Sequence, residues 1–440
     1  MKKLIVLLCF PFVTLAQKNY PALLDDYAQA EFTVKEFNGT VLVMQKGKAI
    51  YTKSFGMADR EWNVPNTANT KFRIGSVTKQ FAAACILLLA EQGKLSVDDN
   101  LSKYISDYPK GDSITIHMLL NHTSGIKNYT DIPEFWPKAV LPLSTDSMIA
   151  LFKNKPLDFS PGTNWNYSNS GYFLLGVIVE KVTGKNFTAY LAENIIEKAG
   201  LKNTSMDRLD SVLAFRAKGY SKNRMGGWNH ADYISMETPY SAGAMVSTVE
   251  DLYLWTKALH NNQVLSSTTT KKMLTPYKNN YGYGIGIDSL KTHKRVSHSG
   301  GIPGFVSYLA YFPADDLCIV TISNNGSNAS SLGIALSSIM FNLPFQKSYK
   351  PKEVKIDAAI LDNYVGKYIA TGPIELIKKD NKLYRRRAGS PDIELKPESN
   401  TRFFYADNSD RFIEFEVDQT GKIIKAWFIG SGEKIEMKQQ

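Results

Sequence analysis

The sequence predicts an α/β (α+β) fold: an antiparallel sheet flanked by helices, with an inserted helical lobe, followed by a small antiparallel β-barrel-like domain. Three observations predict it. Strand-like runs lie at both ends of residues 17–345, and the segment between them is helical and rich in turns. One early helix is apolar on every side. From about residue 355 to 440, short strand-like runs alternate with Gly, Asn and Asp turns. Strands at both ends of a domain are most simply joined in one sheet.

Residues 1–16 have the pattern of a secretory signal peptide. Lys2 and Lys3 precede a short apolar run, and small residues occupy positions −3 and −1 of a cleavage site after Ala16. The apolar run is too short to span a bilayer. We therefore expect an exported protein, periplasmic or secreted, with no integral membrane segment once the signal is removed.

The composition is that of a globular protein, with 43% hydrophobic and 21% charged residues. The net charge of +10 comes without a dense basic tract, since the longest pure run is Arg385–Arg387, so we expect no nucleic-acid partner. After signal removal two cysteines remain, Cys85 and Cys318, each in an apolar run. A buried free thiol is the default interpretation of such a cysteine, and a disulfide between the two stays open.

The sheet is expected to take its strands from both ends of the first domain. Residues 39–59 contain two β-rich runs around a Gly-containing turn, which predicts a hairpin. Further strand-like runs near the other end precede a helix around 331–342. These runs are 281–287, which alternates with period two, 306–312 and 317–323.

Helices are expected in the middle of this domain. The run Phe81–Ala90 is apolar all the way round, so it predicts a helix buried in the interior rather than one on the surface. A short helix is expected to end within 119–126, at a Ser-Gly break, and further helices are expected at 172–184 and 247–261.

Ser76 and Lys79, at the start of the buried helix, are the first candidates for chemistry. They are three residues apart and so share one face of a helix. A buried lysine is costly without a partner or a task. Lowering its pKa by about three units, at roughly 4 kcal/mol, would let it take the proton of the serine. The alternative is that Ser76 only caps the helix and that Lys79 extends outward.

Tyr167 and Asn169 form a second motif, at the end of a turn-rich stretch and before the apolar helix 172–184. A tyrosine hydroxyl can relay protons, and an asparagine amide both donates and accepts hydrogen bonds. The alternative is a loop tyrosine beside a helix-capping asparagine.

The segment His298-Ser299-Gly300-Gly301 is the third motif. It lies directly before a strand-rich segment. Glycines let the backbone approach a ligand closely, and the Gly301 N–H is a candidate oxyanion donor worth roughly 3 kcal/mol to a transition state. The alternative for His298 is an ordinary turn residue.

Together, the SxxK, YxN and HxG triplets in this order resemble the serine β-lactamase and penicillin-binding-protein superfamily. Within it, the chain is most similar to the class C-like branch, which also holds DD-peptidases, D-aminopeptidases and carboxylesterases. The resemblance covers roughly residues 30–340 and extends to FRIGSVTKQF, LLNHTSGI, FSPGTNWNYSNSGYFLLG, AGAMVSTVEDLYLW and HSGGIPGF. It implies a β-lactamase-like fold and no metal or organic cofactor.

The resemblance also implies roles for the motif residues. Ser76 is the acylated nucleophile, and Lys79 and Tyr167 share the roles of general base and acid. The backbone N–H groups of Ser76 and Gly301 hold the oxyanion. The substrate-binding and oxyanion residues are Asn169, His298, Gly300 and Gly301.

One motif departs from the β-lactamases of this branch. Many of them carry Lys-Thr-Gly where this chain has His298-Ser299-Gly300. A histidine there is similar to the peptidase and esterase members, and it removes a cation that would meet a substrate carboxylate. We therefore do not expect efficient β-lactam hydrolysis. The domain over residues 355–440 resembles small β-rich domains appended to some of these hydrolases.

The leading hypothesis is an exported serine hydrolase that forms an acyl-enzyme on Ser76. Its expected partner is a small-molecule or peptide substrate with an amide or ester bond: a D-amino-acid peptide, a small ester or, less efficiently, a β-lactam. Two alternatives stay open: a transacylase, and a slowly turning-over penicillin-binding or peptidoglycan-sensing protein. Metal-ligand spacing is absent among the histidines, and the lack of a G-x-S-x-G elbow argues against an α/β-hydrolase.

Overall fold

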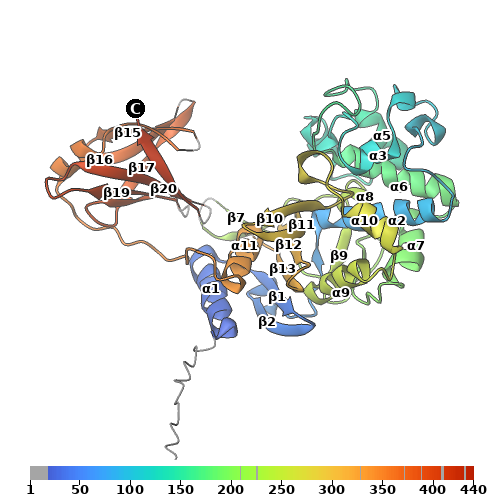
Figure 1. The fold of residues 1–440 in the computed structure, drawn as a ribbon, viewed down its shortest axis with the longest axis horizontal. Coiled ribbons are helices and arrows are strands. Elements are labelled where there is room, and N and C mark those ends of the chain that lie inside the picture. Colours follow the sequence, from blue (N-terminus) through green and yellow to red (C-terminus); the bar gives the residue numbers. More distant parts are fainter. Residues whose placement is uncertain are drawn as a thin grey trace, which may run out of the picture.

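The computed structural model describes residues 18–440 except 209, 224–225, 328, 371, 388, 408–410 and 431–432. The expected signal peptide, residues 1–16, lies outside the described residues. Figure 1 shows a larger unit built around a sheet and a separate barrel, joined by a segment that passes α1 (Tyr20–Lys35).

A six-stranded antiparallel sheet unites the two ends of the larger unit, which confirms the predicted architecture. Its strand order is β10-β11-β12-β13-β1-β2. The two chain ends meet where β1 pairs with β13, from Gly39↔Ser323 to Gln45↔Leu317. The strands are β1 (Gly39–Gln45), β2 (Lys48–Phe55), β10 (Gly286–Leu290), β11 (His293–Ile302), β12 (Phe305–Phe312) and β13 (Leu317–Ser323).

Helices cover both faces of the sheet because apolar residues alternate along its strands. Successive residues of a strand point to opposite faces. On β1, Val41 and Val43 belong to the core under α1 and α11, whereas Leu42 belongs to the core that contains α2 and α9. These helices are α2 (Thr78–Glu91), α9 (Val249–His260) and α11 (Ala329–Met340).

Helix α2 runs through the interior, as its lack of a polar face predicts. Every residue from Thr78 to Leu89 is buried. It packs against α6 (Asn169–Thr183) and α8 (Tyr240–Gly243) of the helical lobe. Helix α6 begins three residues before the predicted range 172–184, because the Ser168 side chain caps it by accepting a hydrogen bond from the Gly171 N–H.

The rest of the lobe consists of short helices and small sheets. The helices are α3 (Ile116–Leu120), α4 (Phe135–Lys138), α5 (Thr145–Phe152), α7 (Phe187–Leu191) and α10 (Ser267–Met273). The strands are β3 (Met57–Asp59), β4 (Val64–Pro65), β5 (Phe72–Arg73), β6 (Ser205–Met206), β7 (Tyr220–Lys222), β8 (Trp228–His230) and β9 (Met245–Ser247).

The prediction of a strand over 281–287 is wrong for most of that run. Only its last residues enter β10, and residues before Gly286 form a turn. Gly284 has φ of +73°, and a Cβ there would lie 2.6 Å from the carbonyl oxygen of Lys79. The glycines in this run therefore permit close approach to α2, which the period-two alternation does not reveal.

The C-terminal unit is a closed antiparallel barrel of eight strands in sequence order, β14 to β21. Its interior is filled by side chains, among which Tyr364 stacks on Phe415 with ring centroids 4.1 Å apart. The strands are β14 (Gly366–Ile369), β15 (Pro373–Lys379), β16 (Lys382–Arg387), β17 (Ser390–Pro397), β18 (Arg402–Tyr405), β19 (Phe412–Val417), β20 (Ile423–Gly430) and β21 (Glu433–Gln439).

The segment between the units contacts both of them. Phe345 packs edge-on against Tyr27 of α1, with ring centroids 5.7 Å apart. Tyr349 stacks on Phe412 of the barrel at 5.7 Å. The backbone N–H of Val354 donates to a carbonyl of β17. These contacts hold the barrel next to α1.

Both remaining cysteines are free and buried, as their apolar surroundings predict. Burial raises the pKa of Cys318 to about 12 and also raises the pKa of Cys85. Neither is therefore a nucleophile at neutral pH.

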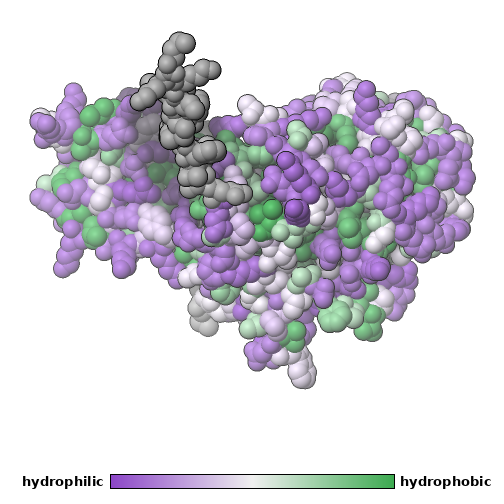
Figure 2. All heavy atoms as spheres, turned by 60° about the horizontal axis from the view of Figure 1, so that its bottom comes forward, coloured by the Kyte–Doolittle hydropathy of each residue, from purple (hydrophilic) through white to green (hydrophobic). Residues whose placement is uncertain are grey.

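The described surface is mainly polar. Figure 2 shows one face on which hydrophilic residues predominate and hydrophobic ones are scattered in small groups. Among the helices of residues 18–440 that the structure describes, none combines the length and the apolar character that a membrane span requires.

Candidate active site

Ser76 lies where strand β5 turns into helix α2. The connection is a 3-10 turn over Gly75–Val77. Gly75 has φ of +51°, and a Cβ there would lie 2.8 Å from the Gly301 nitrogen, so this position requires glycine. The turn leaves Ser76 partly exposed at the N-terminal end of a buried helix.

Lys79 is fully buried and has three polar contacts. Its Nζ lies 3.1 Å from Ser76 Oγ, 2.7 Å from Asn169 Oδ1 and 2.8 Å from the Ala242 carbonyl oxygen. Among the residues that the structure describes, no carboxylate contacts it, and burial lowers the pKa of Lys79 well below its ordinary value. A neutral amine has two N–H groups and one lone pair. The amide and carbonyl oxygens accept the two N–H groups, which leaves the lone pair for the Ser76 hydroxyl.

Asn128 fixes the orientation of the Asn169 amide. The backbone N–H and the Nδ2 group of Asn169 both donate to Asn128 Oδ1, at 3.0 and 3.2 Å. The Nδ2 group of Asn128 in turn donates to Asp131 Oδ1 at 3.2 Å. A carboxylate and a backbone N–H have fixed roles, so this chain of bonds leaves Asn169 Oδ1 facing Lys79.

The Tyr167 hydroxyl is buried and has no hydrogen-bond partner of ordinary geometry. Its ring centroid lies 4.8 Å from Lys79 Nζ. Burial raises the pKa of Tyr167 above its ordinary value, and the nearby Ser76 hydroxyl opposes part of that rise. The phenol is therefore protonated at neutral pH and is a proton donor rather than a resident base.

His298 is a buried neutral imidazole rather than a cation. Its Nδ1 donates to the Ser299 carbonyl oxygen at 2.6 Å, so its Nε2 accepts from the Tyr281 hydroxyl at 2.8 Å. Burial and the nearby Lys79 lower the pKa of His298 to about 4. Since both nitrogens are occupied, this side chain carries no charge toward a substrate.

Gly300 and Gly301 bring strand β11 against the nucleophile turn. A Cβ at Gly300 would lie 2.0 Å from the Ile74 carbonyl oxygen and 2.9 Å from the Ser76 nitrogen. Pairing of β11 with β10 ends at Ser297, so residues 298–302 form an open edge. Backbone groups alternate between the two sides of a strand. The pair Ile302↔Phe305 closes the turn toward β12, and the Gly301 N–H therefore points toward the open edge.

His122 borders the site. It has a left-handed φ of 63°, and its ring centroid lies 4.3 Å from that of Tyr167. Its Nδ1 accepts from the Ser168 N–H at 3.1 Å. Burial, with Lys79 and His298 nearby, lowers the pKa of His122 well below its ordinary value. It therefore helps to hold the backbone that follows Tyr167.

The structure brings all three motifs together around Ser76. Lys79 and Asn169 are in direct contact, Tyr167 and His298 lie beside them, and the two glycines form one wall. Asn128, Tyr281 and the Ala242 carbonyl complete the site, and the sequence did not single them out. Ala242 lies in AGAMVSTVEDLYLW, which contributes only to the family resemblance, and Tyr281 lies in residues 281–287, where the sequence predicts a strand.

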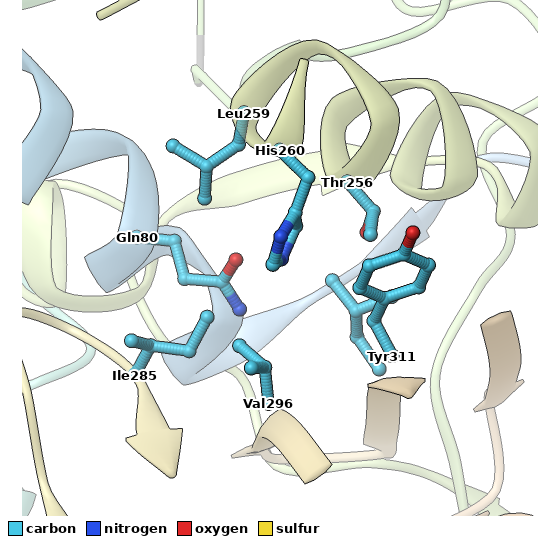
Figure 3. Close-up of a pocket in the computed structure, with 8 residues that line it drawn as sticks. Gln80, Thr256, Leu259, His260, Ile285, Val296 and Tyr311 are labelled. Atoms are coloured by element: carbon cyan, nitrogen blue, oxygen red, sulfur yellow. The ribbon is translucent and has the colours of Figure 1, made fainter. Parts of the chain in front are cut away.

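A small cavity behind α2 is too small for a substrate. Figure 3 shows Gln80, the neighbour of Lys79, with His260 and Tyr311 around it. Its volume of about 10 Å³ holds at most a single water molecule. Within the described ranges, no group of three or more His, Cys, Asp or Glu side chains could hold a metal ion.

Comparisons with known proteins identify relatives of this chain. A family model described as Beta-lactamase matches residues 30–336. Penicillin-binding protein 4* of Bacillus subtilis (strain 168) is 29% identical over 400 residues, which are 84% of this chain and 88% of that protein.

Two solved structures show the same similarity. A penicillin binding protein from Bacillus halodurans is 30% identical with a TM-score of 0.65, covering 71% of this chain and 98% of that one. The octameric penicillin-binding protein homologue from Pyrococcus abyssi is 24% identical with a TM-score of 0.69, covering 95% of this chain and 99% of that one. This last similarity extends over both units of the fold.

Proposed function

The chain belongs to the Beta-lactamase family, a group of penicillin-binding-protein-like serine hydrolases, and from that premise we propose that it is an exported hydrolase that forms an acyl-enzyme on Ser76. Its substrate is an amide or ester. The observation that carries the proposal is the contact of Ser76 with a buried lysine whose two N–H groups are committed elsewhere.

The first step uses Lys79 as the base. Ser76 Oγ attacks the substrate carbonyl carbon and passes its proton to the lone pair of Lys79 Nζ. As the new Oγ–C bond forms, the carbonyl π electrons move onto oxygen and give a tetrahedral oxyanion. We assign the backbone N–H groups of Ser76 and Gly301 as its donors, each worth roughly 3 kcal/mol.

The second step releases the leaving group. The electron pair of the oxyanion re-forms the carbonyl, the bond to the leaving nitrogen or oxygen breaks, and that atom takes a proton. Tyr167 supplies the proton and regains one from the Lys79 ammonium, which fits its protonated, unpartnered hydroxyl. Water then attacks the acyl-enzyme by the same route, and the acid product leaves with Ser76 restored.

The third motif bears on the substrate class. A neutral His298 with both nitrogens occupied gives no cation for a carboxylate on the leaving-group side. We therefore propose small esters and D-amino-acid amides or peptides as the main substrates, and carboxylate-bearing β-lactams as poor ones.

A hydrolysis panel tests this function. Wild type, Ser76→Ala and the control Ser113→Ala, an exposed serine outside the site, are assayed with aryl esters, D-alanyl peptides and a chromogenic cephalosporin. We expect Ser76→Ala alone to lose turnover, with the cephalosporin the slowest wild-type substrate. Full turnover by Ser76→Ala would overturn the proposal.

The name of the Bacillus subtilis relative favours a second candidate function. In this alternative the protein is acylated by penicillin and hardly turns over. A burst of one product equivalent per enzyme, followed by a negligible steady rate with every substrate in the panel, would support it over hydrolysis.

A further inference from the structure

A cavity of about 280 Å³ is lined by Arg73, near Ser76 in sequence, and has no role in the steps above. Its walls come from residues 216–219 and 230–233, from Arg73, and from the turn between β11 and β12. All of these lining residues are among those that the structure describes. The lining combines basic side chains with apolar ones, which include Pro303 and Phe305.

The cavity shares two structural elements with the reactive site. Arg73 is the last residue of β5, three positions before Ser76. Pro303 and Phe305 follow Gly301 at the end of the open edge of β11. The Arg73 guanidinium lies 5.8 Å from the Phe305 ring centroid, so these two elements meet at the cavity. At roughly 3.4 Å per strand residue, Pro303 lies about 7 Å along the edge from Gly301.

The position of the proton donor indicates which half of the substrate points toward the cavity. The leaving atom takes its proton from Tyr167, whose ring centroid is 6.3 Å from that of His298, at the start of the open edge. The leaving group therefore lies toward His298. The acyl group extends the opposite way from the oxyanion position, past Gly301 toward the turn and the cavity.

Two arginines of the cavity share one carboxylate, that of Asp207, which leaves one positive charge in excess among these three side chains. Arg73 Nε and Arg216 Nη1 each donate to this one buried carboxylate, at 2.7 and 2.6 Å. Two guanidinium groups against one carboxylate leave a net charge of +1, and each guanidinium has four further N–H groups. Carboxylates are the anions that this planar group binds in bidentate fashion.

The other charged residues do not add to this excess. Lys218 forms ion pairs with Asp59 and Glu61, two carboxylates that do not line the cavity, so this group has one negative charge in excess. His230 contacts the same Glu61. Asp232 also lines the cavity and adds a negative charge, which solvent screens because the residue is exposed, as it also screens the charge of the exposed Arg216.

We propose that this cavity is an acyl-side subsite for a carboxylate, held by Arg216 and Arg73, so that preferred substrates carry an acidic group at the far end of the acyl chain. The inference rests on the proposed function. It makes the chain selective for acyl groups with a negative end, such as an N-succinyl-D-amino acid, over neutral acyl groups of the same length.

Two matched substrates test it: the p-nitrophenyl esters of N-succinyl-D-alanine and of N-butanoyl-D-alanine. They differ only in the terminal carboxylate. We expect wild type to have a kcat/KM about 10- to 100-fold higher for the succinyl ester, as one charged hydrogen-bonded pair provides. Added salt should lower that ratio. A ratio of one or less in wild type overturns the proposal without any mutant.

Arg216→Gln should reduce the ratio toward one while leaving the butanoyl ester rate unchanged. Asp207 keeps Arg73 as its partner in this variant. Arg208→Gln is the matched control, since this exposed arginine on the same segment pairs with Asp210 and does not line the cavity. An unchanged ratio in Arg216→Gln, or an equal loss in Arg208→Gln, overturns the assignment.

The outcome for the general function is read separately. Ser76-dependent hydrolysis of the butanoyl ester without a succinyl preference overturns the subsite and leaves the serine hydrolase standing. Loss of Ser76 dependence for both esters overturns both.

Discussion

Replacing Asn169 by aspartate would put a carboxylate oxygen where an amide oxygen now accepts from Lys79. The two atoms are 2.7 Å apart. At that distance and an effective dielectric constant of about 20, two unit charges attract by about 6 kcal/mol. Desolvation of the new carboxylate offsets part of this attraction. We therefore expect the pKa of Lys79 to rise by about 1–3 units.

The direction of the effect follows from the role of Lys79. A base must be deprotonated to act, so kcat/KM rises with pH through the pKa of Lys79. Asn169→Asp should move this rise to higher pH by about 1–3 units and lower activity near neutral pH by about 10- to 1000-fold. The assay is kcat/KM for a neutral aryl ester across the pH range in which the enzyme stays folded.

Asn169→Ala is the matched control, because it removes the same hydrogen bond without adding a charge. It should lower activity without moving the profile to higher pH. An Asn169→Asp profile that coincides with that of wild type would refute Lys79 as the base.

Four other substitutions test the surrounding geometry. Gly300→Ala should abolish turnover, because its Cβ would meet the Ile74 carbonyl oxygen at 2.0 Å. Gly301→Ala should keep most of the turnover, because its Cβ would have nothing within 4 Å. Equal esterase rates of the two folded variants would contradict this. Asn128→Ala should lower kcat about 10-fold with little change in KM, because it releases the Asn169 amide, and a change in KM alone would count against that role. The folded protein holds His298 neutral, with a pKa of about 4 against about 6.5 in the unfolded chain. The stability that this contributes is present above the unfolded pKa. It is lost as pH falls toward 4, by up to about 3 kcal/mol. Urea unfolding of wild type and His298→Gln at neutral and acidic pH checks it, and an identical pH dependence would disprove it.

Much of the fold follows from local patterns in the sequence. Helix α2 is recognisable because no side of Phe81–Ala90 is polar, and the sheet because β-rich runs lie at both ends of its domain. The sequence pattern mispredicts secondary structure where a residue is required by a long-range contact rather than by its helix or strand propensity. Gly284 interrupts an apparent strand because α2 passes close to it.

Two barrel strands also escaped the sequence pattern. Strand β17 contains two prolines, and β21 alternates charged residues with only two apolar ones, Ile435 and Met437. Strand β21 is recognised only when the barrel closes, since it pairs with β14, the first strand of the unit, at Tyr368↔Gln439 and Ile369↔Lys438. Long-range pairing of this kind leaves little trace in local composition.

The site was partly predictable for the same reason. Ser76 and Lys79 are three residues apart, in the turn before α2 and in its first turn, so spacing alone placed them together. Asn128 is 41 residues from Asn169, and only the fold brings their amides into contact. The neutral state of His298 likewise depends on Tyr281, whose hydroxyl reaches it from a turn that resembles a strand in sequence.

The most direct test of the central claim is the mass of the enzyme during turnover of a slow ester. We predict that wild type gains the mass of one acyl group, that the modified peptide contains Ser76, and that Ser76→Ala gains none. Hydrolysis at the full wild-type rate with no acylated species, or with the acyl group on another residue, would contradict the claim that Ser76 is the nucleophile.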